Sequence, residues 1–161
     1  MDQEQHGFWV IWASFLAALV LAIIALPQWL MWARPEWLAL TLIYWTIALP
    51  HRIGLLSALL LGICLDSLEG AVIGQNVFAL MIMSLLSLVL YQRLRVYNLL
   101  QQAGTIFVLI GIHQLICQWV ENFQGSGTRS LMFLLPAVSS ALVWPVVFYT
   151  LRALRRHYRV S

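Results

Sequence analysis

The sequence predicts an all-α integral membrane protein with six transmembrane helices, because it is far too apolar for a soluble domain. Hydrophobic residues fill 62% of the 161 positions and charged residues only 9%, whereas soluble domains carry about 25% charged residues. The apolar residues form six runs, and most of the basic residues lie on one side of the resulting topology. We therefore expect a single transmembrane domain over residues 1–161, with no nucleic-acid-binding face.

The first three runs are delimited by prolines and charged residues. Pro27 ends the first run, and the second begins at Pro35 and Glu36. Both suit the first turn of a helix, because proline lacks the N–H that would be unpaired there and an acid complements the positive end of the helix dipole. Pro50 ends this second run, which is short for a complete crossing and is expected to tilt or to lie where the membrane is thin. The third run ends near Glu69. The six expected helices cover approximately residues 8–26, 35–49, 53–69, 71–90, 99–121 and 131–151.

The last three runs differ in polarity. The fourth carries no charged residue and ends shortly before Arg93. The fifth is the most polar, since it holds several glutamines together with His113. Two of them, Gln114 and Gln118, are expected to form hydrogen bonds between helices. The sixth contains Pro136 and Pro145, either of which can kink a helix, and leads into a basic tail.

The arginines orient these helices. With six crossings, one side of the membrane receives both termini and seven of the nine basic residues, all of which are arginine. Because positive charge is enriched on the cytoplasmic side, both termini are predicted to be cytoplasmic. The seven cytoplasmic arginines are Arg52, Arg93, Arg95, Arg152, Arg155, Arg156 and Arg159, and the outer side receives Arg34 and Arg129.

A glycine-rich motif with one acid lies at the end of the third run. It places Gly62, Asp66, Gly70 and Gly74 at intervals of four residues. Each step of four drifts only about 40° around a helix, so the first three would share a narrow face. The sequence leaves two interpretations open, a binding or proton-relay site and a polar contact that pins two closely packed helices, and it favours the second.

Other polar residues in the apolar runs predict packing contacts more than chemistry. Arg34 is expected on the outer side, either paired with a carboxylate in the mouth of the bundle or solvated at the interface. His113 and Cys117 have the i, i+4 spacing of two metal ligands, but two ligands make no site, so a histidine hydrogen-bonded to another helix is expected. The sequence predicts no metal, no cofactor, no disulfide and no enzymatic activity, because no nucleotide loop, zinc-protease helix or serine elbow is present.

Several short motifs, taken together, resemble the rod shape-determining MreD family, most closely its proteobacterial form. The resemblance covers essentially the whole chain. The motifs are Trp9-Val10-Ile11-Trp12, Arg34-Pro35-Glu36-Trp37, Leu49-Pro50-His51-Arg52, the Gly62–Gly74 motif, Trp119-Val120-Glu121 and Leu142-Val143-Trp144-Pro145. Glu36 departs from the family pattern, in which Asp or Asn is expected.

The resemblance implies a protein of the bacterial inner membrane that supports cell shape and lateral peptidoglycan synthesis. Its partners would be MreC directly, the RodA glycosyltransferase and a class B penicillin-binding transpeptidase within the elongation complex, MreB indirectly, and membrane lipids. It also implies a fold like that of the substrate-binding subunits of energy-coupling-factor transporters. The family brings no agreed catalytic role to any position.

Two functions therefore follow from the sequence. The leading function is that of a non-enzymatic interaction subunit that docks partners by helix–helix contacts. The alternative is a small-molecule or lipid-binding transport subunit, in which Asp66, Arg34 and His113 line an outward-facing pocket. The candidate partner, packing or pocket residues are Arg34, Pro35, Glu36, Gly62, Asp66, Gly70, Gly74 and His113.

Overall fold

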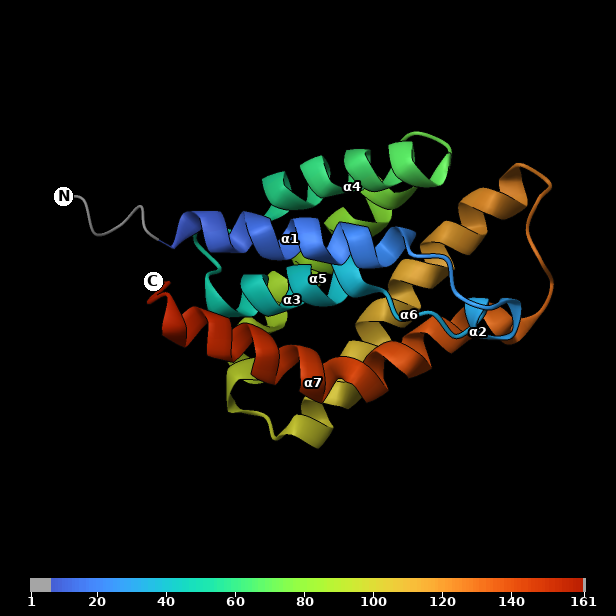
Figure 1. Cartoon of the computed structure of the whole chain (residues 1–161). Coiled ribbons are helices and arrows are strands. Elements are labelled where there is room, and N and C mark those ends of the chain that lie inside the picture. Colours follow the sequence, from blue (N-terminus) through green and yellow to red (C-terminus); the bar gives the residue numbers. More distant parts are fainter. Residues whose placement is uncertain (1–6, 161) are drawn as a thin grey trace.

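The structure, a computed structural model, describes residues 7–160 and contains only helices and their connections over that range. The start of α1 and the end of α7 lie at the same end of the molecule, and the short helix α2 lies at the opposite end (Figure 1). In chain order the elements are α1 (Phe8–Ile23), α2 (Gln28–Met31), α3 (Trp37–Ala48), α4 (Leu55–Glu69), α5 (Gln75–Val96), α6 (Leu99–Phe123), the 3-10 helix η1 (Leu131–Leu134) and α7 (Leu135–His157).

Helix α3 forms the centre of the bundle. Every residue from Leu38 to Ala48 is buried, because α1, α5 and α7 pack around the helix. This explains its uniformly apolar sequence, since a helix that is hydrophobic on all sides is a buried one. With 12 residues it is only about 18 Å long, compared with about 30 Å of hydrocarbon in a bilayer.

Aromatic side chains fasten the surrounding helices to α3. The Trp45 indole nitrogen donates a 2.8 Å hydrogen bond to the Ser14 hydroxyl of α1. On the α7 side, the rings of Tyr44 and Phe148 meet edge to face with centroids 5.8 Å apart. The indole of Trp144 is fully buried and donates to Gln102 of α6 at 3.1 Å. Each buried indole N–H therefore has an acceptor on a neighbouring helix.

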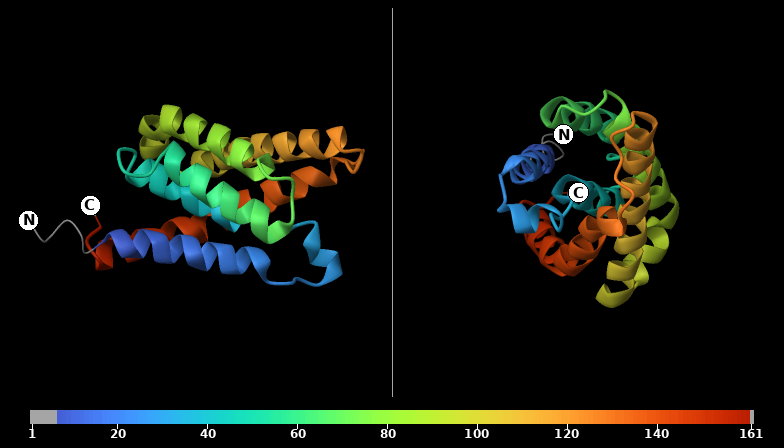
Figure 2. Two further views of the ribbon diagram at one scale, coloured as in Figure 1. Left: turned by 90° about the horizontal axis from the view of Figure 1, so that it is seen from above. Right: turned by 90° about the vertical axis from the view of Figure 1, so that its right-hand side faces the viewer.

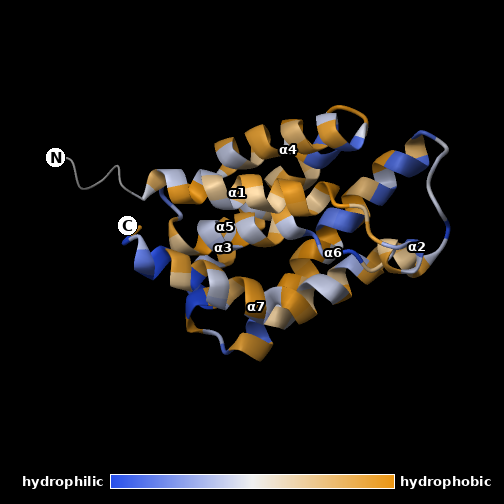
Figure 3. Ribbon diagram, viewed as in Figure 1, coloured by the Kyte–Doolittle hydropathy of each residue, from blue (hydrophilic) through white to orange (hydrophobic). Residues whose placement is uncertain are grey.

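The surface of the bundle is suited to lipid. Figure 3 shows hydrophobic residues along the middle of the helices and hydrophilic residues toward their ends. By length and composition, the three segments Gln75–Val96, Leu99–Phe123 and Leu131–His157 can each cross a membrane, whereas α1 and α3 are shorter apolar helices. Figure 1 shows α1 and α4 side by side, whereas α6 runs obliquely to them, and the end-on view of Figure 2 shows the same inclination. The fold is therefore that of an all-helical membrane protein.

The helix ends differ from the apolar runs because hydropathy marks apolar sequence, whether buried or lipid-facing, while backbone hydrogen bonding decides where a helix stops. The first run, expected to reach residue 26, ends as a helix at Ile23 and is followed by the separate α2. In contrast, α5 continues past residue 90 through Arg93 and Arg95, and α7 continues to His157. Basic residues in a last turn complement the negative end of the helix dipole, so these helices extend beyond their apolar part.

Helices α4 and α5 form a tightly packed hairpin. A Cβ atom added at Gly62 would lie 2.5 Å from the Cα and 2.8 Å from the N of Val77, closer than real Cβ contacts. Glycine at position 62 therefore lets the two backbones approach, as small residues do between membrane helices.

We expect the substitution Gly62→Ala to lower the free energy of unfolding by about 1–3 kcal/mol, because the added methyl group forces the two backbones apart. Gly104→Ala is the matched control: it also lies inside a helix, but an added Cβ meets nothing within 4 Å. Since alanine is the better helix former, the control should be neutral or stabilising by up to about 1 kcal/mol. Unfolding in mixed micelles measures both, and equal effects would contradict the close packing.

Candidate functional site

Asp66 joins the two helices of the α4–α5 hairpin through its carboxylate. The side chain is 1% exposed, and its two oxygens accept hydrogen bonds of 2.8 Å each from the backbone N–H groups of Gly74 and Asn76. Those groups lie at the start of α5, where a helix has unpaired N–H groups and the positive end of its dipole. The buried charge is thus stabilised by the backbone of the next helix.

The glycines of the motif allow the chain to turn back toward Asp66. Gly70 ends α4 in the left-handed conformation with φ 65°, and Gly74 precedes α5 with φ 109°. The carbonyl oxygen of Asp66 accepts the N–H of Ala71 at 3.1 Å, which closes the end of α4. Gly62 and Asp66 therefore both face α5, as expected. Gly70 instead lies at the end of α4, where its left-handed conformation lets the chain turn.

Polar side chains at the start of α5 extend this contact to α6. The Asn76 amide donates to Glu69 at 3.1 Å and accepts from the Cys117 thiol at 3.7 Å. Next to it, the Gln75 amide lies 3.4 Å from a carboxylate oxygen of Glu121. Hydrogen bonds thus connect α4, α5 and α6 at one end of the bundle.

The segment before α3 is held at the same end. The backbone N–H of Glu36 donates to the Ser140 hydroxyl of α7 at 2.9 Å, and the Gln114 amide of α6 donates to the Glu36 carboxylate at 2.7 Å. The sequence predicted Pro35 at the first position of α3. In the structure this helix begins at Trp37, so Pro35 lies two residues before it. Glu36 lies in the connection outside the helices, and burial raises the pKa of its carboxyl against the opposing effects of Gln114 and Arg34.

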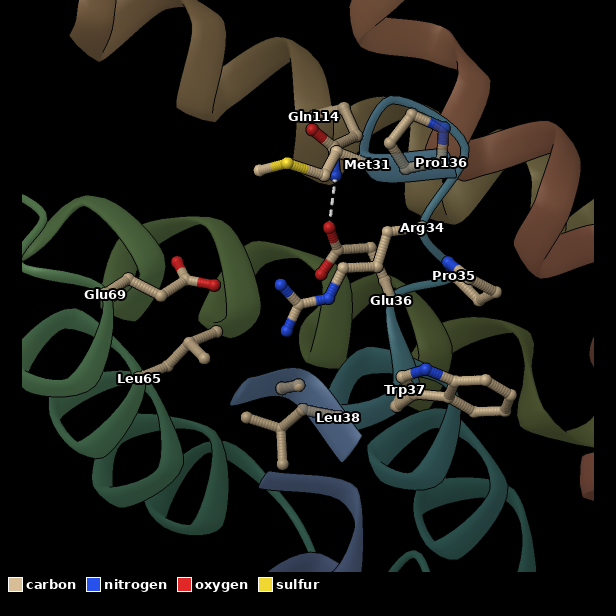
Figure 4. A pocket seen from close by; sticks show the side chains of 11 residues that line it. Met31, Arg34, Pro35, Glu36, Trp37, Leu38, Leu65, Glu69, Gln114 and Pro136 are labelled. Carbon is tan, nitrogen blue, oxygen red and sulfur yellow. Dashed lines mark hydrogen bonds between the residues drawn. The ribbon is translucent and has the colours of Figure 1, made fainter. Parts of the chain in front are cut away.

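A cavity of about 140 Å³ opens between these segments (Figure 4). Polar side chains from three parts of the chain line it: Arg34 and Glu36, Glu69 at the end of α4, and Gln114 of α6. The Nη2 atom of Arg34 is buried and has no hydrogen-bond partner within residues 7–160. The cavity therefore offers a guanidinium donor beside two carboxylates, and Leu65 and other apolar residues complete its lining.

The structure separates the candidate residues into three groups. Arg34, Pro35 and Glu36 line the cavity, and the four residues of the Gly62–Gly74 motif build the hairpin. His113 belongs to neither group: it is 2% exposed, and in the described part of the chain neither of its ring nitrogens has a hydrogen-bond partner. The expected hydrogen bond from His113 to another helix is thus not formed there, and no group of three metal-ligating side chains occurs among residues 7–160.

Asn76 and Ser140 carry key contacts that the sequence did not single out. Asn76 bonds to the Glu69 carboxylate, and Ser140 accepts the backbone N–H of Glu36. Gln114, expected to form a hydrogen bond between helices, bonds to the Glu36 carboxylate just before α3. The signal available for Asn76 was its place just after Gly74, at the start of an apolar run. No comparable signal pointed to Ser140, because serines are common in membrane helices and its partner lies 104 residues away.

Together, these contacts describe a helical membrane protein whose buried polar groups connect helix ends. Comparison with known proteins narrows that class. The chain belongs to the family of the rod shape-determining protein MreD, because the model of that family matches residues 3–154.

A named relative agrees with this assignment. The rod shape-determining protein MreD of Haemophilus influenzae is 28% identical over 153 residues, which is 95% of this chain and 94% of the relative. No solved structure matches the chain. The family, and with it a role in cell shape, therefore rests on sequence similarity along nearly the whole length.

We expect replacements of Asp66 to destabilise the protein in a graded order. Asn can accept only one of the two backbone hydrogen bonds and carries no charge, so Asp66→Asn should lose about 1–3 kcal/mol, and Asp66→Leu, which accepts neither, should lose more. Ser67→Ala is the control, since that exposed hydroxyl bonds only within α4. Unfolding in mixed micelles gives the order, and equal stability of all variants would show that the cap contributes nothing.

Proposed function

We propose that this chain is a non-enzymatic, multi-pass subunit of the bacterial inner membrane that holds the cell-wall elongation machinery in a productive arrangement. Its partners would be MreC, the RodA glycosyltransferase and a class B penicillin-binding transpeptidase, with MreB reached indirectly. Membership in the MreD family supports this proposal. The polar groups around Asp66 also support it, because their contacts join helices.

The proposed orientation has six crossings with both termini in the cytoplasm. The start of α1 and the end of α7 lie at one end of the bundle, where Trp9 and Tyr158 contact each other with ring centroids 5.2 Å apart. An even number of crossings agrees with this arrangement, and the basic tail would then be cytoplasmic. A fold like that of the substrate-binding subunits of energy-coupling-factor transporters remains part of the proposal.

Helix α4 is the surface we propose for docking a partner. It packs chiefly on α5 and lies at the edge of the bundle (Figure 1). Leu56, Leu60 and Ile63 point outward and are 71%, 45% and 44% exposed, whereas Gly62 and Asp66 on the opposite side hold α5. The exposed residues recur at helical spacing, so a partner helix can pack along one stripe.

A crosslinking experiment in cells tests this proposal. Photoreactive residues placed at Leu56, Leu60 and Ile63 should each yield an adduct with MreC, while the buried positions Ala58 and Leu61 of the same helix should yield none. Depletion of the protein should cause loss of rod shape. Crosslinks of equal strength from both sets, or none from either set, would rule out docking on α4.

The cavity beside Arg34 supports a second candidate function, the binding of a small molecule or lipid. Its supporting observation is the buried Nη2 atom of Arg34 without a hydrogen-bond partner in the described chain. A hydrogen-bond acceptor on a ligand that entered the cavity would supply the missing partner. Of the three residues first expected to line such a pocket, only Arg34 does so.

Native mass spectrometry of the purified protein tests this second function. A retained small ligand should be visible in the unmodified protein and lost in Arg34→Gln. Arg129→Gln is the control, because Arg129 is exposed and does not line the cavity. A ligand that survives Arg34→Gln, or the absence of any ligand from the unmodified protein, would count against it.

A further inference from the structure

A second, larger cavity lies at the other end of α3. It measures about 290 Å³ and is bounded by the end of α3, the end of α5, the start of α6 and the second half of α7. Three arginines line it, namely Arg95 from α5 and Arg152 and Arg155 from α7, and among residues 7–160 no Asp or Glu does. The cavity is therefore positively charged, in contrast to the mixed charge around Arg34.

The three guanidinium groups are held in different ways. Arg95 donates from Nε to the Ile47 carbonyl at 2.9 Å and from Nη2 to the Ala48 carbonyl at 3.1 Å, which fixes it at the end of α3. Arg155 donates to the carbonyl of Val160 at 3.3 Å. Arg152 has no hydrogen-bond partner within residues 7–160, and its Cζ atom lies 5.8 Å from the ring centroid of Phe148. Among residues 7–160, Arg152 is thus the lining arginine with no donor engaged in a hydrogen bond.

The walls of the cavity combine this charge with apolar surface. Leu94 and Phe148 line it beside the arginines. In Figure 3 the hydrophilic end of α7 follows directly on its hydrophobic middle part. The cavity therefore lies near the end of the bundle where charged residues follow the hydrophobic part of α7, and in the orientation proposed above this end would face phospholipid headgroups.

We propose that this cavity binds the phosphate group of an anionic phospholipid, such as phosphatidylglycerol, from the cytoplasmic leaflet. Arginine presents planar, paired donors that match phosphate oxygens, and several such donors from separate helices make a site more selective than a flexible basic tail. Leu94 and Phe148 would contact the glycerol and the first part of the acyl chains. The choice of leaflet rests on the orientation proposed above, but binding itself can be measured without it.

The competing explanation is general attraction between the basic tail and any anionic surface. In that case Arg156, which is exposed and does not line the cavity, would matter as much as Arg152 on the same helix. The substitutions Arg152→Gln and Arg156→Gln remove the same charge from the same helix and are therefore a matched pair.

Native mass spectrometry of the full chain, titrated with phosphatidylglycerol, tests the proposal. Arg152→Gln should weaken binding about tenfold, as expected for loss of a charge-assisted hydrogen bond, and Arg156→Gln by less than about twofold. Phosphatidylcholine should bind weakly to every form. Equal losses in the two variants, or equal binding of both lipids, would overturn the proposal.

Two further probes decide the nature of the ligand. If glycerol phosphate binds as tightly as the lipid, the cavity is a site for a soluble phosphate compound. If a polyglutamate peptide binds in an Arg152-dependent way and the lipid does not, the cavity is a site for an acidic protein segment. Ala48→Leu keeps all three arginines but places a larger side chain in the cavity, so it should also weaken lipid binding about tenfold. Unchanged binding in Ala48→Leu would place the lipid elsewhere.

Discussion

The hydrogen bonds from the start of α5 to the Asp66 carboxylate hold one end of this bundle together. Both carboxylate oxygens are used, and both donors belong to the backbone, so the acid acts as the cap of a helix that follows it in sequence. This cap sets the direction in which α5 leaves the turn. Because Gln75 and Asn76 stand in the first turn of α5, the same direction brings their amides to Glu121, Glu69 and Cys117.

This arrangement accounts for an acid inside an apolar chain without assigning it a reaction. A buried carboxylate is costly when it lacks donors, but a helix start supplies N–H groups that would otherwise be unpaired in the same apolar setting. Asp66 and the start of α5 thus satisfy each other. This structural use of the acid is compatible with membership in the rod shape-determining MreD family.

Sequence reasoning predicted the helical membrane class and the structural use of Asp66, because both depend on local patterns of hydropathy and spacing. It did not predict the contact of Ser140 or the partner of Gln114, since these depend on which segments become neighbours. The helix ends differed for a related reason: α5 and α7 continue into basic residues that hydropathy does not count as part of a span. His113 was expected to bond across helices, but packing encloses its ring without offering either nitrogen a partner in the described chain.

The shortness of α3 links the two cavities. Glu36 and Leu38 border the cavity at one end of this helix. Ile47 and Ala48 border the cavity at the other end, so α3 separates the two hollows. The surrounding helices are longer and continue past it. Hydrogen bonds from Trp45 to Ser14 of α1, and from Arg95 of α5 to the Ile47 and Ala48 carbonyls, hold α3 in place along its axis. The length of this one helix therefore sets the distance between the two hollows.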